Sequence, residues 1–403
     1  MFTTQNSHRL PSELEVMPFI LRLMEFIGLW GPPGQIVRFL AAFGWGTMII
    51  LFPKAVLGIG SDRFDAIAKG IAEFIFEGSL FVATAIFASK RIAFERLIDG
   101  LKEIFQRATN GPHSNDCYDL LLRQNLSINK FVKGYTIYCC LGPFVFCAPS
   151  LAASHFRYWT HSGNQSEPLI FELPMEQEFY GLQIRTNFLH YHIFVLLSLF
   201  AYFVCAYFLL VKVSVHFIMI QYSSSTYRLV ALRIRKMTES KEVTQSELVD
   251  IVELVDIVEL HRLAYRCSTL VEQICHLPLA LEFLTCILFW CLTMFYVSNN
   301  IDFNLVNVMV LFWLSLLETF GYSYLGSKLT EQADEVGAAI YDLPWFEHSV
   351  ELQRYYRLML QRVQRPTGIT GAKFFVVQLA TFGSVVQMSY SYYLVLKEAL
   401  TMI

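Results

Sequence analysis

Charged side chains are scarce in this sequence. They make up 16% of its 403 residues, whereas soluble domains carry roughly 25%. The net charge of -3 provides no basic surface of the kind that attracts nucleic acid, so nucleic-acid binding is excluded as the main role. No segment rich in proline, glycine and serine divides the chain into soluble domains. With 55% hydrophobic residues, the composition is that of a membrane protein.

The sequence also lacks the motifs that anchor common enzyme chemistry. It contains no P-loop, no dinucleotide fingerprint, no HExxH helix and no nucleophile elbow. His190 and His192 are two residues apart and would point to different sides of a helix, while His155 and His161 have no cysteine or carboxylate at ligand spacing. We therefore expect no enzyme, no cofactor and no metal site.

Seven apolar runs are long enough to cross a membrane, for which a helix needs about 20 mostly apolar residues. A shorter apolar stretch, 17–30, contains Arg22 and Glu25 and predicts an interfacial helix. The predicted fold class is an all-α membrane protein with seven transmembrane helices. The runs are 36–57, 71–89, 131–153, 189–211, 276–298, 303–326 and 371–396.

Lysine and arginine residues predict the orientation, because they are retained on the cytoplasmic side of a membrane. Residues 90–130, 212–275 and 327–370 are rich in them, and the opposite connections are poor. The amino terminus should thus be cytoplasmic and the carboxyl terminus extracellular, the inverse of a G-protein-coupled receptor. A glycosylation sequon at Asn164 lies in the predicted outer loop, although the sequon at Asn125 falls in a predicted cytoplasmic segment.

Two carboxylates, Glu73 and Glu77, lie at i,i+4 within the second run. A carboxylate in hydrocarbon is costly unless it faces protein or water, so both should face the bundle interior. The functional interpretation is that they form a polar anchor in a ligand cavity or part of an ion route. The alternative is that both are structural groups. In the structural alternative, Glu73 lies at headgroup level and Glu77 pairs with a polar neighbour.

A short repeat, ELVDIV, occurs at 247–252 and again at 253–258. Its acidic residues step by three, which leaves an apolar arc and predicts an amphipathic cytoplasmic helix. A solvated face on a packed helix and an acidic stripe that binds a partner both remain open. The acidic residues are Glu247, Asp250, Glu253, Asp256 and Glu259.

The carboxyl-terminal quarter carries the most specific pattern: YDLPW at 341–345, QRP at 364–366 and SYSYY at 389–393. Together these motifs resemble the insect odorant receptor family, in particular its odorant-binding subunits, and length and span number agree over the whole chain. Gustatory receptors usually carry a Gln-Phe pair after a Thr-Tyr in the last span, whereas here Gln387 precedes the tyrosines. The olfactory co-receptor is longer through the loop that corresponds to 212–275.

The resemblance implies a heterotetrameric, ligand-gated, non-selective cation channel formed with the olfactory co-receptor in the dendritic plasma membrane of a sensory neuron. A small volatile odorant would open it, and lipid and permeating cations would contact it. Pro366, Gly368 and Gly371 would separate a cytoplasmic helix (337–365) from the last span. By family position the last span lines the pore with Tyr392, Val395 at a hydrophobic constriction and Glu398 at the outer mouth.

The resemblance also places an odorant cavity in the outer half of the membrane. The lining residues that it implies are Phe74, Glu77, Gly78, Phe81, Cys147, Ala148, Leu151, Tyr158, Tyr191, Phe194, Val195, Val308, Phe312 and Ser315.

The resemblance and the predicted spans together divide the chain into six parts. These are 1–35 (cytoplasmic segment with the interfacial helix), 36–211 (spans one to four, with the odorant-binding outer half), 212–275 (cytoplasmic loop and anchor helices), 276–326 (spans five and six), 327–370 (cytoplasmic anchor helix) and 371–403 (pore-lining span and extracellular tail).

Two other classes of membrane protein fit the sequence less well. A metabotropic seven-helix chemoreceptor is disfavoured by the orientation, by the lack of an Asp-Arg-Tyr element after span three and by the lack of a cysteine in the loop 154–188. A transporter is expected to show two related halves with interrupted helices, and the sequence shows none.

Overall fold

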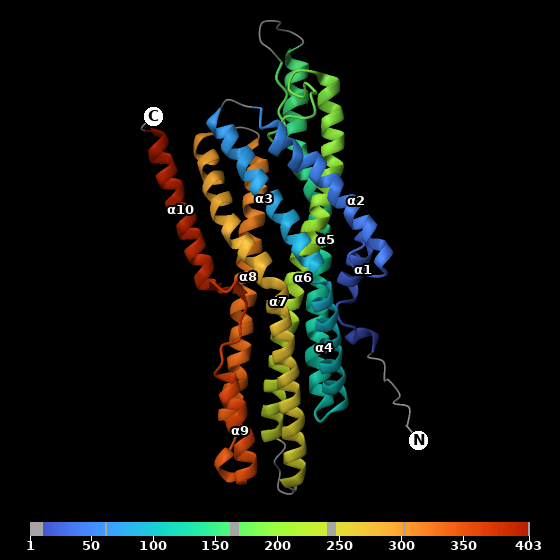
Figure 1. Cartoon of the computed structure of the whole chain (residues 1–403), viewed down its shortest axis with the longest axis vertical. Coiled ribbons are helices and arrows are strands. Elements are labelled where there is room, and N and C mark those ends of the chain that lie inside the picture. Colours follow the sequence, from blue (N-terminus) through green and yellow to red (C-terminus); the bar gives the residue numbers. More distant parts are fainter. Residues whose placement is uncertain (1–10, 61–62, 162–168, 240–246, 301–303, 402–403) are drawn as a thin grey trace.

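Long α-helices form most of the protein in the computed structural model, which describes residues 11–60, 63–161, 169–239, 247–300 and 304–401 (Figure 1). The α-helices are α1 (Pro18–Ile27), α2 (Ile36–Gly46), α3 (Phe64–Ser89), α4 (Arg91–Asn110), α5 (Ser114–His161), α6 (Phe188–Glu239), α7 (Glu247–Asn299), α8 (Asn304–Tyr341), α9 (Val350–Val363) and α10 (Leu379–Thr401). Short 3-10 turns occur at Ser12–Leu14, Pro33–Gln35 and Trp345–Glu347, and π-helical turns continue α2 at Thr47–Leu51 and Pro53–Leu57.

Six helical segments among the described residues are long and apolar enough to cross a membrane. They contain the first five predicted runs and all but the first two residues of the sixth. The helices are longer than the runs because polar, amphipathic segments continue them past the apolar part. The 23-residue helix α10 is not among the six. The segments are Pro33–Leu57, Phe64–Ser89, Ser114–Thr160, Phe188–Met237, Ile251–Asn299 and Leu305–Tyr341.

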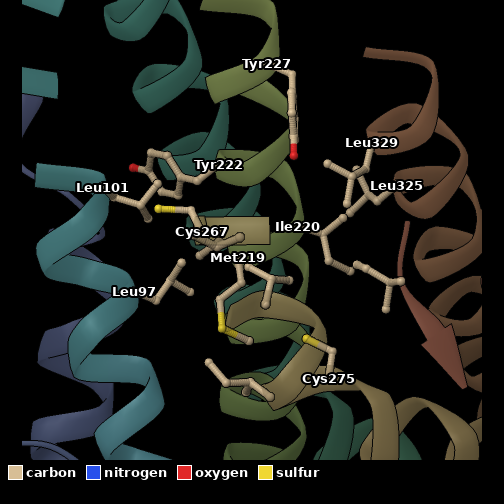
Figure 2. Packing of buried hydrophobic residues seen from close by; sticks show 14 of the residues in the cluster. Leu97, Leu101, Met219, Ile220, Tyr222, Tyr227, Cys267, Cys275, Leu325 and Leu329 are labelled. Atoms are coloured by element: carbon tan, nitrogen blue, oxygen red, sulfur yellow. The ribbon is translucent and has the colours of Figure 1, made fainter. Parts of the chain in front are cut away.

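The lower half of the molecule is a helical bundle of α4, α9 and the extended ends of α5 to α8 (Figure 1). Helix α4 has an apolar face that includes Leu97 and Leu101, spaced by four residues, and both are buried. Figure 2 shows them pointing toward Met219 of α6 and Cys267 of α7. This core gives the extended helix ends a packed environment of their own.

The acidic repeat lies at the start of α7, which continues without interruption into the predicted fifth span. Asp256 pairs with Arg233 of α6 at 3.0 Å and with Arg107 of α4 at 3.8 Å. The side chains of Glu247 and Asp250 fall outside the described residues. The described part of the stripe therefore connects neighbouring helices, which favours the packed-helix interpretation over a partner-binding stripe.

The predicted cytoplasmic helix 337–365 is wrong as one element. Helix α8 ends at Tyr341, and α9 begins only at Val350. Pro344 cannot continue a helix, and Ser349 starts the next one as an N-cap whose hydroxyl accepts from the backbone N–H of Leu352.

The predicted start of the last helix at 371 is also wrong, since α10 begins at Leu379. Residues Thr370–Gly371 (β1) and Phe375–Val376 (β2) pair as a small antiparallel hairpin, whose turn at Ala372 and Lys373 has positive φ angles. A short apolar run does not distinguish strand from helix. Gly326 of α8 accommodates this segment, because a Cβ there would lie 2.1 Å from the carbonyl oxygen of Val377.

Candidate functional site: a cavity between two buried ion clusters

A cavity lies among α3, α5, α6 and α8, with about 660 Å³ of space that no protein atom fills, part of it at an open mouth. Gly142 and Pro143 line it from α5, where glycine has no side chain to fill the space and proline removes a helical hydrogen bond. The full lining is Phe76, Glu77, Leu80, Tyr138, Cys139, Gly142, Pro143, Phe146, Met175, Tyr202, Cys205, Ala206, Leu209, Val310, Leu311 and Leu314.

The walls are almost entirely apolar or aromatic, and Glu77 is the one charged residue in the lining. The polar side chains beside it are the phenols of Tyr138 and Tyr202 and the thiols of Cys139 and Cys205. Apolar walls with a few convergent polar groups are the usual character of a site for a small organic ligand.

Glu77 belongs to a buried ion cluster at one side of the cavity. The Nζ atom of Lys54 lies 3.1 Å from Oε2 of Glu73 and 3.3 Å from Oε2 of Glu77. The side chains of the three residues are at most 4% exposed. Because an unpaired charge in this position would be costly, the ammonium group of Lys54 compensates the two carboxyl groups that it contacts.

The loop between α5 and α6, predicted from the sequence to be an outer loop, completes this cluster. Lys69 lies 3.8 Å from Glu73 and 3.4 Å from Glu176 of the loop before α6, and Arg185 holds Glu176 at 2.8 Å. The backbone N–H of Glu176 donates to Glu73 at 3.1 Å. Three cations and three carboxylates thus join α3, the segment after α2 and the outer loop.

Glu176 is the member of this cluster in the loop. Burial alone would raise its pKa, but Lys69 and Arg185 outweigh burial and hold the pKa of the carboxyl below its ordinary value. The ionised carboxylate therefore stabilises the folded loop above the ordinary pKa of glutamate. That contribution is lost as the pH falls through the lowered value.

A second buried ion cluster lies one helical turn beyond the cavity on α6 and α8. Lys212 of α6 contacts Glu282 of α7 at 2.7 Å and Glu318 of α8 at 2.6 Å. Tyr322 donates to Glu318 at 2.9 Å. These three helices are therefore held in register next to Leu209 and Leu314 of the cavity wall.

Aromatic side chains connect the same helices to α10. The indole N–H of Trp290 donates to Ser315 at 3.0 Å, and the Trp290 ring packs against Phe312. Phe382 of α10 packs against Trp290 and against Phe320 of α8. A shift of α8 beside the cavity would therefore be transmitted to α10 through these contacts.

Of the ligand-binding residues predicted from the sequence, only Glu77 lines this cavity. Val308 lines a small neighbouring pocket with Lys69 and Glu73. A separate buried cluster around Phe171 contains Cys147, Tyr191, Phe194 and Val195, with Leu151 packed against it.

The other predicted lining residues lie elsewhere around the helices. The Phe81 ring packs against Phe43 and Phe208, and Ser315 is buried against Trp290. Phe74 and Tyr158 are 37% and 42% exposed. Their binding roles stay predictions, together with those of Gly78 and Phe312, which are half-buried, and Ala148, which is exposed.

The sequence interpretation missed Lys54 and Met175, which contact each other at the cavity side of the cluster. Lys54 had a detectable signal, since it is a lone lysine near the end of the apolar run 36–57. Met175 had none, because its place in the cavity depends on how the outer loop folds back over α3.

The predicted pore residues lie on the exposed face of α10. Tyr392 is 54% and Val395 64% exposed, and Glu398 is exposed as well. Val385 and Ser389 of the same helix are buried instead, and α10 packs against α7 and α8. Tyr392 and Val395 therefore lie on the face of α10 that the rest of the chain leaves exposed.

The two sequons have different positions. Asn164 lies outside the described residues. Asn125 is buried, its amide donates to the backbone carbonyls of Glu13 and Glu15, and its carbonyl accepts from Tyr222. An asparagine held in this way is not exposed for glycosylation.

Comparison with known proteins gives concordant results. The sequence model of the family described as 7tm Odorant receptor matches residues 69–390. The odorant receptor coreceptor of Drosophila melanogaster is 29% identical over 100 residues, which are 25% of this chain and 21% of that protein. The Aedes aegypti coreceptor is 31% identical over 106 residues, covering 26% and 22%. The matched segment thus spans only about a fifth of the length of each of these two relatives.

Two further similarities extend the comparison. Odorant receptor 2a of Drosophila melanogaster is 24% identical over 139 residues, covering 34% of this chain and 35% of that protein. The insect olfactory receptor OR5 from Machilis hrabei, in a structure with eugenol, superposes with a TM-score of 0.75 at 15% identity, covering 94% of this chain and 97% of that one. At this identity the likeness shows the fold alone.

Proposed function

We propose, from the premise that the chain belongs to the 7tm odorant receptor family, that it is the odorant-sensing subunit of a ligand-gated, non-selective cation channel formed with the olfactory co-receptor. The observation that carries the proposal is the apolar cavity with Glu77 as its one charged lining residue. A small volatile molecule matches such walls, because it gains by leaving water and needs few polar partners.

The proposed mechanism follows the contacts from the cavity to α10. An odorant favours the open channel only if it binds the open state more tightly than the closed one. Val310, Leu311 and Leu314 place α8 in the cavity wall, and Phe382 links α8 and Trp290 to α10. A ligand-dependent shift of α8 would therefore change the position of the pore-lining helix.

Seven spans, a cytoplasmic amino terminus and assembly as a heterotetramer in the dendritic plasma membrane are part of this proposal. They are supported by the alternation of basic connections and by the exposed face of α10, which offers Tyr392 and Val395 to neighbouring subunits. The test is co-expression with an olfactory co-receptor and recording of odorant-evoked current while G proteins are blocked. Loss of all current under that block would favour a metabotropic receptor instead.

The pore assignment predicts separable effects on ion flow. Glu398→Gln removes one negative charge per such subunit from the outer mouth, so relative permeability to divalent cations should fall first, because their electrostatic energy scales with charge. Val395→Ala should widen and partly rewet the constriction and raise the current without odorant. Reversal potentials and basal current measure the two effects.

Phe146→Ala, in the wall of the cavity, provides the contrasting variant. It should shift odorant potency and leave ion selectivity unchanged. Because the co-receptor shares the pore, partial effects are expected. If both α10 variants reach the surface with unchanged selectivity and basal current, α10 does not line the pore with this face.

The proposed topology is tested by labelling cysteines with a membrane-impermeant reagent. Asn164→Cys should react in intact cells, whereas Asn110→Cys, at the exposed end of α4, should react only after permeabilisation. The unmodified chain, with its nine native cysteines, measures the background. Labelling of Asn110→Cys in intact cells would overturn the orientation.

A further inference from the structure

Two histidines on different helices meet at the outer ends of α5 and α6. The Nε2 atoms of His155 and His192 lie 3.3 Å apart. The Nδ1 atom of His155 lies 2.8 Å from the carbonyl oxygen of Leu151, and Nδ1 of His192 lies 2.8 Å from that of Phe188. Both rings are half-buried, so each is partly reached by solvent.

These contacts fix which nitrogen carries the proton. A carbonyl oxygen only accepts hydrogen bonds, so each Nδ1 must be the donor of its pair. In the neutral ring the other nitrogen, Nε2, then has a bare lone pair. The two lone pairs of His155 and His192 are therefore directed at one another, an unfavourable arrangement unless a positively charged species lies between them.

We propose that His155 and His192 form a binding site for a divalent transition-metal ion of the zinc class. Zinc–nitrogen bonds are about 2.0–2.1 Å long, so two nitrogens at adjacent corners of a zinc tetrahedron lie about 3.3–3.4 Å apart. The observed separation of 3.3 Å has this value without any movement of the rings. Metal-bound histidines also commonly donate their other N–H to a carbonyl, as both do here.

The surroundings hold the rings in this arrangement. The Phe188 ring lies 4.1 Å from that of His192, and the Tyr191 ring packs edge-on at 5.5 Å. The nearby cation, Arg157, is paired with Glu172, which reduces its repulsion of a metal ion. No group of three possible ligand residues occurs among the described residues, so water would complete the coordination and the ion would exchange readily.

Metal binding would join the outer ends of α5 and α6. The cavity is lined by the same two helices farther along, at Tyr138 and Phe146 of α5 and at Tyr202 and Leu209 of α6. Fixing the helix ends would limit their separation and reduce ligand entry or the response to it. This effect on odorant response rests on the proposed function, whereas the binding site itself does not.

The binding experiment uses the purified full chain in lipid nanodiscs. Competition of Zn²⁺ with a chromogenic chelator measures the zinc bound per chain. His155→Ala and His192→Ala should each lose one zinc equivalent relative to the unmodified chain. His190→Ala is the matched control on the same helix, because its Nδ1 atom already accepts from the backbone N–H of Gln183.

His155→Cys adds a second check, since a thiolate is also a zinc ligand and should restore the equivalent that alanine removes. Thermal unfolding without metal identifies any variant that fails to fold. In that case the cysteine variant and His192→Ala decide the result. Equal zinc binding by the unmodified chain and all folded variants would overturn the site.

A second measurement tests the consequence for the channel. Zn²⁺ should reduce the odorant-evoked current of the unmodified receptor and of His190→Ala, and should have no effect on His155→Ala. Zinc binding without any change in current overturns the effect on the helices but leaves the site. Absence of odorant current in all receptors contradicts the proposed function and does not affect the binding result.

Discussion

Lys54→Met is expected to remove a large part of the protein's stability. Methionine has a similar length but no charge, so Glu73 and Glu77 would remain buried with one fewer cation. Breaking a buried ion pair by removing one partner costs about 3–5 kcal/mol, compared with a total stability of about 5–15 kcal/mol for a typical protein. Surface expression and the monodisperse fraction after solubilisation measure the loss.

Two further variants make this prediction specific. Lys102→Met removes a lysine that is half-exposed beside Asp99 and should have almost no effect, because surface ion pairs contribute about 0–1 kcal/mol. The triple change Lys54→Met with Glu73→Gln and Glu77→Gln removes the uncompensated charges and should recover part of the expression. Normal expression of Lys54→Met alone would show that the cluster does not stabilise the fold.

Gly142→Leu is expected to produce the largest loss of odorant sensitivity. A Cβ at this position meets no atom within 4 Å, and the residue lines the cavity, so the leucine side chain can enter the space without backbone strain. Displacing the ligand by this volume should cost about 1–3 kcal/mol, the usual penalty of overpacking. Odorant potency should therefore fall about fivefold to 150-fold, measured as the concentration for half-maximal current.

Gly134→Leu is the matched control for this change. Gly134 lies on the same helix, its added Cβ also meets no atom within 4 Å, and it is not in the cavity wall. It should leave potency unchanged. If both variants express normally and respond with the same potency, odorants bind elsewhere, for example beside Tyr191 in the separate buried cluster.

The sequence predicted the membrane helices well because hydrocarbon imposes a simple requirement. Each crossing needs a long apolar run, and such runs are visible without any knowledge of contacts. The sequence did not show that α6 and α7 continue for 52 and 53 residues, since their amphipathic parts become stable only through packing in the lower bundle.

The residues that form the site were harder to predict from the sequence. Lys69 and Glu176 are 107 residues apart, and their pairing depends on the path of the outer loop. His155 and His192 are separated by 37 residues and lie on two helices. The expectation of no metal site was based on the spacing of ligands within one segment, which does not detect a contact between two helices. Positions assigned by family resemblance correspond to the cavity lining only at Glu77.

The continuous length of α6 has a mechanical consequence. Its 52 residues extend for about 78 Å, roughly two and a half times the hydrocarbon thickness of a bilayer. A helix of this length acts as a lever. A tilt of about 3° near the cavity displaces a point about 50 Å farther along the helix by roughly 2.5 Å. Displacements of one to two ångströms are enough to repack helix interfaces between subunits. In the proposed receptor, a ligand that tilts α6 beside the cavity would in this way rearrange contacts at the far end of the helical bundle.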